Sequence, residues 1–379
     1  MILRNGYFVF ILFIFFIIAG CAGKSGKMLP QSQPLSSVNT SQIDFVDDLD
    51  IKSLDLAIER SLSYYDDLGD DKVCQLADRK ISVSRLRESL IEFRRVIKNE
   101  DSLEERKRRI NRDFDVYRAA GQDGYGSVLF TGYYVPQLAG SRTRTKKYKY
   151  PLYKAPPELL SKNNSKAAPY FSRREIDIGG VLRGKNLEIA WVADPVELFF
   201  LHIQGSGEIK FEDDTILTVS TLFTNGRPYR SVPAYLLKKG VIGRDASNRN
   251  VKRFLKEKDE DALFEILSYN ERYIFFKLVE KPTGALGKPV TAGRTIATDP
   301  EMFPPGALAF IRLSKPALDN EGNPTAKRIP FSRFVLNQDK GAAIKGPGRV
   351  DLFCGFGNSA ESTAANLKEK GELYFLIKK

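Results

Sequence analysis

Hydrophobic positions in the first third of the chain repeat at the spacing of an α-helix. Leu86, Leu90, Phe93 and Ile97 follow one another at intervals of four, three and four residues, so they would lie along one face of a helix. Charged and polar residues occupy most positions between them. The pattern predicts a largely helical segment over residues 48–127.

The pattern changes near residue 128. Short apolar or alternating runs now follow one another, separated by Gly, Pro and Asn, as in residues 128–134 (VLFTGYY) and 187–192 (LEIAWV). Such runs are typical of β-strands joined by turns. They predict a β domain that begins near this point.

Helical and strand patterns alternate in the rest of the chain. Helices are predicted within residues 231–239, within 251–269 and near 360–370, the last of them ended by Gly371. The apolar run 373–377 (LYFLI) predicts a final strand. The chain is therefore expected to be mainly β with N-terminal helices, an α+β class.

The N-terminus has the pattern of an export signal. Arg4 precedes an unbroken apolar run, residues 7–18, which is shorter than the ~20 residues that a membrane-spanning helix needs. Small residues lead directly to Cys21, and this arrangement resembles the bacterial lipobox, in which the signal is cut before a cysteine that is then acylated. We expect a signal peptide over 1–20, a lipid on Cys21 and a polar tether over 21–47. The alternative is an uncleaved anchor helix.

The charge composition indicates which kinds of molecule such an exported chain would bind. Lys and Arg number 59 against 47 acidic residues, a formal net charge of +12, and a basic balance favours polyanionic partners. Exported proteins rarely meet nucleic acid, so the cell envelope is the expected location. Ala22 follows the lipidated cysteine in place of the Asp that marks inner-membrane retention. The outer membrane is therefore favoured, with the protein facing the periplasm.

Cysteine and histidine are too scarce for most metal or triad chemistry. After acylation of Cys21 only Cys74 and Cys354 remain, and they could form a disulfide or stay as small buried residues. His202 is the single histidine, so a zinc site built from His and Cys ligands is nearly excluded. A catalytic Ser-His-Asp or Cys-His arrangement would have to use His202. It lies in the apolar run 198–203, which predicts a buried strand, so a core histidine is the better interpretation.

Carboxylates in Gly-rich, apolar surroundings are the candidates for acid–base catalysis. Asp339 ends an apolar strand and opens a Gly-rich turn, and Asp351 lies inside a second apolar strand. Burial raises the pKa of a carboxyl group, and a second carboxylate nearby raises it further, which is the condition for a general acid at neutral pH. Asp299 lies in a Pro-rich turn, which it could cap, or it could point at the site.

Several segments, in their order along the chain, resemble the membrane-bound lytic murein transglycosylase A family and its three-aspartate domain. They are FTGYY (130–134), YPLY (150–153), WVADPVE (191–197), IQGSG (203–207), NGRPYR (225–230) and GRT (293–295), followed by the segments of Asp299, Asp339 and Asp351. The resemblance covers roughly residues 128–379. The chain departs from the family pattern at Val135, where many relatives carry an acid, and at Cys354, where an aromatic residue is commoner.

The resemblance implies two domains. Residues 276–379 would form a double-psi β-barrel, with the helical residues 48–129 packed on it. Residues 130–275 would form an inserted second β domain, and the substrate groove would lie where the two meet. No metal or organic cofactor is implied.

The resemblance also implies a reaction and partners. The bond cleaved would be the β-1,4 bond between N-acetylmuramic acid and N-acetylglucosamine in peptidoglycan, with 1,6-anhydromuramic acid ends as products. Asp351 would be the single acid and base, supported by Asp339 and Asp299. Glycan strands and, through the lipid, the membrane would be the main partners; other proteins of cell-wall synthesis or hydrolysis are further candidates, and nucleic acid is not expected.

Candidate glycan contacts come from the same segments. They are Thr131, Tyr133, Tyr134, Gln204, Gly205, Ser206, Lys345 and Arg349, the last two as contacts to lactyl or peptide carboxylates. We expect Thr131 and Tyr134 to face the groove, and Trp191 to lie in the core.

Plainer interpretations of the same residues remain open. Residues 204–207 could form an ordinary turn, the tyrosines could be ordinary strand residues, and the three aspartates could bind a hard cation. The alternative functions are a glycan-binding lipoprotein without activity and a hydrolytic glycosidase on the same barrel.

Overall fold

The computed structural model describes residues 33–40, 43–98, 102–160, 169–243, 248–319, 324–341 and 343–379. Cys21, the apolar run before it and most of the tether lie outside the described residues. Within the described residues, no helix is both long enough and apolar enough to cross a membrane.

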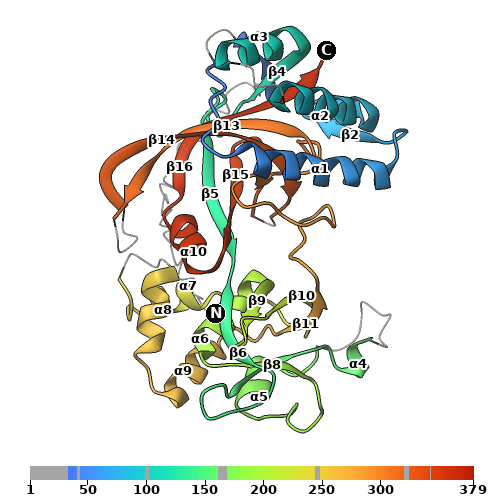
Figure 1. The fold of residues 1–379 in the computed structure, drawn as a ribbon. Helices are drawn as coiled ribbons and strands as arrows, with labels where there is room; N and C mark the ends of the chain where they lie inside the picture. The colour runs from blue at the N-terminus through green and yellow to red at the C-terminus, as the bar shows by residue number, and fades with distance from the viewer. Residues whose placement is uncertain are drawn as a thin grey trace, which may run out of the picture. The chain divides into compact units, whose positions relative to one another are not determined.

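Six strands close into a β-barrel (Figure 1). They are β5 (Val128–Val135), β12 (Thr295–Ala297), β13 (Leu308–Leu318), β14 (Pro324–Asp339), β15 (Arg349–Phe356) and β16 (Lys368–Lys378). Their order is β16-β13-β14-β12-β15-β5, and pairing of β16 with β5 closes the ring. β12 with β14 and β15 with β5 are parallel pairs. β4 (Phe114–Ala119) and β1 (Leu35–Ser37) extend the sheet beyond β16.

The N-terminal helices pack on the barrel. They are α1 (Ile51–Leu68), α2 (Val83–Lys98) and α3 (Leu103–Asp113). α1 contacts β14, and α2 contacts β13 and β16. Phe93 of α2 lies with its ring centroid 4.6 Å from that of Phe334 in β14, and both belong to one hydrophobic core.

The prediction of helix over residues 48–127 is wrong in two places. The hairpin of β2 (Val73–Leu76) and β3 (Arg79–Ser82) interrupts the helices, and β4 follows α3. In β4, Phe114 and Val116 are buried and alternate with more exposed residues. Such short alternating runs are hard to recognise among many charged residues.

Arg294, which is fully buried, ties the start of α1 to the barrel. Its guanidinium pairs with Asp47 at 2.6 Å and donates to the carbonyl oxygens of Phe334 and Asp50 at 2.8 and 2.9 Å. It also donates to Ser53 at 3.0 Å. A buried charge is tolerated only when it is paired and hydrogen-bonded in this way, so this contact fixes segments that lie far apart in the sequence.

The chain between β5 and β12 forms a second sheet. Its strands are β6 (Gln137–Ser141), β7 (Tyr150–Tyr153), β8 (Glu188–Val192), β9 (Ser206–Lys210), β10 (Ile216–Thr224) and β11 (Ile274–Val279), in the order β11-β10-β9-β6-β8-β7. β5 belongs to the barrel and β6 to this sheet, so Pro136 marks the crossing. The mainly β class, with a barrel and an inserted second β domain, is confirmed.

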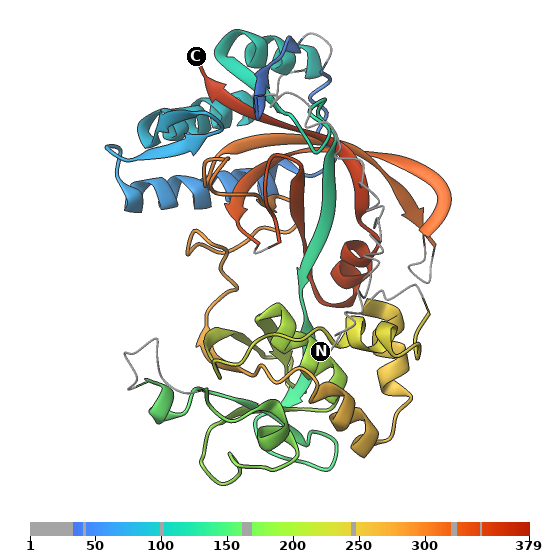
Figure 2. The same ribbon diagram turned by 180° about the vertical axis from the view of Figure 1, so that it is seen from behind.

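Helices accompany this second sheet (Figure 2). They are α4 (Pro157–Leu160), α5 (Arg173–Asp177), α6 (Pro195–Gln204), α7 (Val232–Lys238), α8 (Asn248–Lys256) and α9 (Glu260–Leu267); α10 (Gly357–Ala365) lies between β15 and β16. α6 and α8 share a hydrophobic core with α7 and α9.

Three sequence-based predictions of these elements need correction. The run 198–203 belongs to helix α6 and is not a strand; it begins after an N-cap at Asp194 and is buried along most of its length, so its apolar run imitates a buried strand. Residues 251–269 contain parts of two helices, because Asp259 caps a new one. α10 ends at Ala365, and Gly371 lies within β16.

Candidate active site

Asp339 and Asp351 come from the two strands that flank β12. Ala297 of β12 is paired in register with Asp339 of β14 on one side and with Asp351 of β15 on the other. The barrel therefore places the two carboxylates at the same level of neighbouring strands. They lie close enough together for the charge of Asp339 to help raise the pKa of Asp351.

Asp351 is half-buried, and its carboxyl group accepts a hydrogen bond from a neighbouring strand. Thr131, its register partner in β5, donates through its hydroxyl to Oδ1 at 2.9 Å. Arg349 donates to the same hydroxyl oxygen at 3.4 Å. Burial raises the pKa of Asp351, the Thr131 hydrogen bond and the Arg349 charge oppose that shift, and the net pKa is raised.

Asp339 is held by three donors. The hydroxyl of Tyr133 donates to its Oδ2 at 2.7 Å, and the backbone N–H groups of Ala285 and Lys340 donate to its Oδ1 at 3.0 and 2.8 Å. Burial, followed by the Asp339 charge, raises the pKa of Tyr133 well above its usual range, so the phenol stays protonated and remains a donor. The side chain of Asp339 is therefore fixed in orientation.

Asp299 holds the loop that leads to Asp351. It is buried and accepts from the backbone N–H of Gly346 at 2.8 Å and of Glu301 at 3.2 Å. Lys345 lies 3.6 Å from its carboxylate. Asp299 thus caps its own turn, one of the two roles expected of it, and connects that turn to the β14–β15 loop.

The three aspartates do not gather as ligands of one cation. In the part of the chain that the structure describes, no group of three or more His, Cys, Asp or Glu side chains is placed to hold a metal ion. The donors around Asp339 and Asp299 come from the protein's own backbone and side chains.

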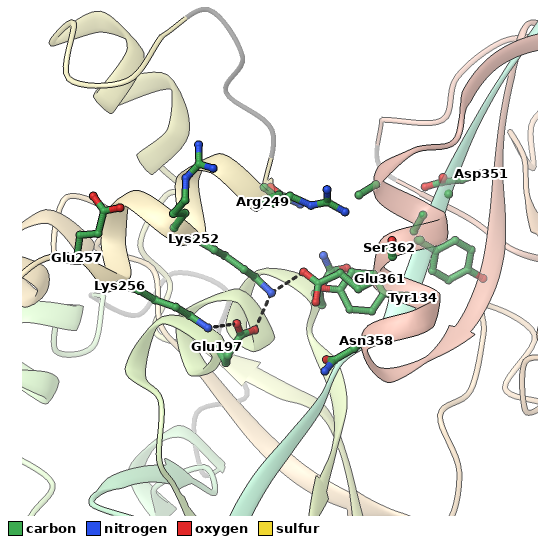
Figure 3. Close-up of a pocket in the computed structure, with 17 residues that line it drawn as sticks. Tyr134, Glu197, Arg249, Lys252, Lys256, Glu257, Asp351, Asn358, Glu361 and Ser362 are labelled. Carbon is green, nitrogen blue, oxygen red and sulfur yellow. Dashed lines mark hydrogen bonds and ion pairs between the residues drawn. The ribbon is translucent and has the colours of Figure 1, made fainter. Parts of the chain in front are cut away.

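A cavity of about 730 Å³ lies at Asp351. β5, β15 and α10 supply one part of its wall, and α6 and α8 supply the other (Figure 3). The first part includes Gly132, Tyr133, Tyr134, Asp351, Asn358, Glu361 and Ser362, and the second includes Glu197, Gln204, Arg249, Lys252, Arg253, Lys256 and Glu257. A half-buried carboxyl group with a raised pKa therefore faces a space large enough for a substrate.

An ion network joins the two parts of this wall. Lys252 of α8 is buried and lies 2.6 Å from both Glu197 of α6 and Glu361 of α10 (Figure 3). Lys256 pairs with Glu197 at 2.8 Å. Near this network, burial and then the Glu361 charge raise the pKa of Tyr134. The network connects the inserted helices to the barrel beside the cavity.

Comparison with known proteins identifies the family. Residues 129–277 match the MltA specific insert domain, and residues 294–377 match the 3D domain. Membrane-bound lytic murein transglycosylase A of Escherichia coli (strain K12) is 30% identical over 266 residues, 69% of each chain. The chain belongs to the membrane-bound lytic murein transglycosylase A family. The Vibrio cholerae protein of that name is 28% identical over 260 residues, 68% of this chain and 67% of the relative.

Solved structures of this family share the fold. The membrane-bound lytic murein transglycosylase of Agrobacterium tumefaciens superposes with a TM-score of 0.70 at 26% identity, over 91% of this chain and 97% of the other. Escherichia coli MltA with bound chitohexaose superposes with a TM-score of 0.70 at 25% identity, over 92% and 95%. The transglycosylase A fold thus extends across nearly all of this chain.

Four of the expected glycan contacts lie at or beside the cavity. Tyr133, Tyr134 and Gln204 line it, and Thr131 is bonded to Asp351. Arg349 is not among the residues that line the cavity, and it donates to the hydroxyl oxygen of Thr131.

The remaining expected contacts have local partners. Gly205 is the C-cap of α6, with a left-handed φ of 80° that favours glycine. Ser206 begins β9 and donates to Ser220 at 3.1 Å. Lys345 is directed to Asp299 and Glu301, at 3.6 and 3.8 Å.

The structure also places the residues for which the sequence suggested a structural role or a departure from the family pattern. His202 is buried, with its pKa lowered well below the usual range by burial and then by Arg173, so it is a neutral core histidine. Cys74 and Cys354 are free thiols. Val135 packs against Val290 and Phe353. Trp191, expected in the core, is only partly buried and lines a separate cavity.

Sequence reasoning missed most of the second part of the cavity wall and Glu361 of the first part. Glu197, Glu361 and the cations of α8 were not candidates. The available signal was the composition of α8, NRNVKRFLK, which contains Arg249, Lys252, Arg253 and Lys256 and no acidic residue.

Proposed function

We propose that this chain is a lytic transglycosylase that cleaves the β-1,4 bond between N-acetylmuramic acid and N-acetylglucosamine in peptidoglycan, with Asp351 as the single acid and base. Support comes from membership of the transglycosylase A family. The observation that carries the assignment of the residue is the raised pKa of Asp351 at the wall of the cavity. A protonated carboxyl group facing a substrate-sized space can act as a general acid near neutral pH.

The reaction needs one titrating group. Asp351 donates its proton to the bridging oxygen as the bond from C1 of the muramoyl sugar to that oxygen breaks. The resulting carboxylate then removes the proton from the C6 hydroxyl of the same sugar, whose oxygen bonds to C1. The product is a 1,6-anhydro ring, Asp351 regains its proton, and no water is consumed, unlike in glycosidases that use two carboxylates.

Neighbouring residues adjust the proton affinity of Asp351. The Thr131 hydroxyl stabilises the carboxylate that forms after proton donation, and Arg349 supports it by its charge. Asp339, fixed by Tyr133, opposes ionisation of Asp351 and so keeps the acid protonated before the reaction. Asp299 keeps the β14–β15 loop in place.

The glycan would occupy the cavity beside Tyr133, Tyr134 and Gln204. Aromatic faces and amide donors suit sugar rings and their acetamido groups. The related Escherichia coli protein has been solved with chitohexaose bound. Gly205, Ser206 and Lys345 are proposed as contacts at the ends of a longer strand, because they lie outside the residues that line the cavity.

The cellular location and the domain division are part of the same proposal. The curated relatives are named membrane-bound. The small residues before Cys21 support a lipid anchor, and Ala22 after it favours the outer membrane. We assign residues 48–129 and 276–379 to one domain and 130–275 to an inserted one, since separate hydrophobic cores lie in these parts.

Product analysis tests the function. Purified peptidoglycan is digested with the wild-type protein, and the released muropeptides are separated and weighed by mass spectrometry. We expect 1,6-anhydro ends. Reducing ends, each heavier by one water, would indicate a hydrolytic glycosidase, and binding without products would indicate a glycan-binding lipoprotein.

A further inference from the structure

A second cavity, of about 360 Å³, lies within the inserted residues 130–275. Its wall comes from β7, β8, α5, α6 and α9, and none of the described residues lines both this cavity and that of Asp351. Leu198 and Phe199 of α6 line the second cavity, whereas Glu197 of the same helix lines the first. Small-molecule sites commonly enclose about 300–1,000 Å³. This inserted-domain cavity is therefore large enough to be a site of its own.

Aromatic side chains form much of the wall of the inserted-domain cavity. They are Tyr150, Tyr153, Trp191, Phe199 and Phe264. Trp191 is the only tryptophan of the chain, and it lines this cavity instead of filling the core. Aromatic rings offer a large apolar surface to a ligand, and their faces attract an ammonium group.

A buried arginine and an aspartate also line this cavity. Arg173 is 2% exposed, and it donates to the backbone carbonyl oxygens of Asn270 and Arg272 at 3.1 and 2.9 Å. Its contact with Asp177 is longer, 3.4 Å. Burial raises the pKa of Asp177, and Arg173 and the phenol of Tyr273 oppose that shift only in part. The charge of Asp177 is therefore incompletely compensated, and an ammonium group of a ligand would stabilise it.

Three further charged side chains line the cavity, namely Glu188, Arg144 and Arg183. Among the described residues, no ion pair joins any of them to a side chain of opposite charge. The guanidinium carbon of Arg144 lies 5.9 Å from the ring centroid of Trp191. Arg183 lies across the backbone of Gly180, where the absence of a Cβ leaves room for its guanidinium group. The cavity therefore presents one acid and two arginines that a ligand can pair with.

These charges lie close to Tyr153. Burial raises the pKa of its phenol to about 12, the charges of Glu188 and Asp177 add to that shift, and the charge of Arg183 opposes it. Two carboxylates and one guanidinium group thus lie near one hydroxyl in the cavity wall. A ligand in this cavity meets negative and positive groups together, so electrostatic complementarity favours a molecule that carries both charges.

We propose that the inserted-domain cavity binds a short peptide that has a free ammonium group and a free carboxylate. The ammonium group meets Asp177 and Glu188. The carboxylate meets Arg183 and Arg144, because a guanidinium group binds a carboxylate through two parallel hydrogen bonds. Apolar side chains of the peptide pack on the aromatic wall. The inference goes beyond the proposed function, since it involves neither Asp351 nor its cavity.

In the cell envelope, the proposed location of this protein, such a peptide has two sources. An amidase releases peptides from peptidoglycan with a free α-ammonium group. In a stem that is still attached to the glycan this amino group is an amide, so a side-chain amine has to supply the ammonium group. Both sources present the same chemistry to the cavity, and separate titrations distinguish them.

Isothermal titration calorimetry of the full-length protein tests the inference. The ligands are trialanine, its N-acetylated form and its C-terminally amidated form. The variants are Glu188→Gln and Arg183→Gln; neither residue is buried, and the Tm of each variant reports whether it folds. Lys185→Gln is the matched control, because Lys185 is an exposed cation of the same turn as Arg183 and does not line the cavity.

We expect the wild-type protein to bind trialanine saturably, and each variant to bind it at least about tenfold more weakly, since a charge-assisted hydrogen bond is lost. Acetylation of the peptide should weaken binding to the wild type as much as Glu188→Gln does. The two changes together should cost little more than either alone, because both remove the same contact. Amidation and Arg183→Gln should be coupled in the same way, and Lys185→Gln should bind like the wild type.

Three results would overturn the inference: no saturable binding of trialanine, an equal loss in Lys185→Gln, or losses from ligand and protein changes that simply multiply. The comparison of the three ligands on the wild type needs no substitution, so it remains decisive if a variant does not fold. The source is identified by titrating peptides released by an amidase and muropeptides that retain their stems. Binding that depends on Glu188 and Arg183 assigns the source, and such dependence in neither set would exclude a cell-wall peptide.

Discussion

The hydroxyl of Thr131 donates a hydrogen bond of 2.9 Å to the carboxyl group of Asp351. The two residues are register partners on parallel strands β5 and β15, so the barrel itself sets this contact. It stabilises the ionised form of Asp351 against the burial that favours the protonated form. The Thr131 hydrogen bond therefore helps Asp351 to release its proton, and the burial of Asp351 helps it to take a proton back.

Removing this hydroxyl should shift the pH dependence of cleavage. In Thr131→Val the carboxylate of Asp351 loses its donor, so the pKa of Asp351 rises further and the alkaline limb of the kcat/KM profile moves to higher pH. Thr131→Ser keeps the hydroxyl and is the control. An alkaline limb that stays in place in Thr131→Val would mean that Asp351 does not set it.

Asp351 should also lower the stability of the protein at high pH. Because its pKa is raised in the folded state, the folded protein holds this proton where the unfolded chain, with a pKa near ~3.9, has released it. Stability therefore falls as pH rises from the unfolded pKa through the folded one. Asp351→Asn removes the titration.

The corresponding measurement is Tm against pH for wild type and Asp351→Asn. We expect the Tm of Asp351→Asn to rise relative to that of the wild type between pH 4 and pH 8. The difference should be a few degrees for each ~1 kcal/mol of destabilisation that the substitution removes. A gap between the two curves that does not change with pH would contradict the raised pKa.

Arg294 should be a large contributor to stability although it lies outside the cavity wall. Arg294→Met removes the buried counter-charge of Asp47, which keeps only backbone donors, and a donor to two carbonyl oxygens. We therefore expect a loss of about 3–5 kcal/mol in denaturant unfolding. The control is Arg94→Met, whose partner Asp55 is more exposed; its loss should be about 1 kcal/mol or less. Equal losses would show that the buried pair has no special role.

Cys21 should determine where the protein is found. Cys21→Ala removes the thiol that is acylated, so the variant should fractionate away from membranes, while the described part of the chain is unaffected. Fractionation and the mass of the N-terminal peptide provide the measurement. A wild-type protein with an intact N-terminus and no lipid on Cys21 would contradict the anchor.

The strands that carry the two proposed catalytic aspartates could be predicted because their signals are local. Asp339 ends β14 and Asp351 lies inside β15, as their apolar neighbours indicated. That Ala297 lies between them depends on strand order, which no local pattern encodes. The resemblance to a known family implied only that Asp339 and Asp299 support Asp351.

Helix α6 shows where local patterns fail. Its apolar run is buried on nearly all sides, so the hydrophobic positions lack helical periodicity and imitate a strand. The better signal was Asp194-Pro195, an N-cap followed by a first-turn proline. The ion pairs of Lys252 with Glu197 and Glu361 join residues far apart in the sequence, so composition alone indicated a basic helix but none of its partners.

The central claim is that Asp351 alone provides the acid and the base, and digestion of purified peptidoglycan by Asp351→Asn tests it most directly. The substitution removes the transferable proton with little change in shape. We expect anhydro-muropeptide release to fall by at least about 10²–10⁴, with glycan binding retained, and Asp339→Asn to lose less because its carboxylate only adjusts the pKa of Asp351. Substantial anhydro-muropeptide from Asp351→Asn would contradict the account.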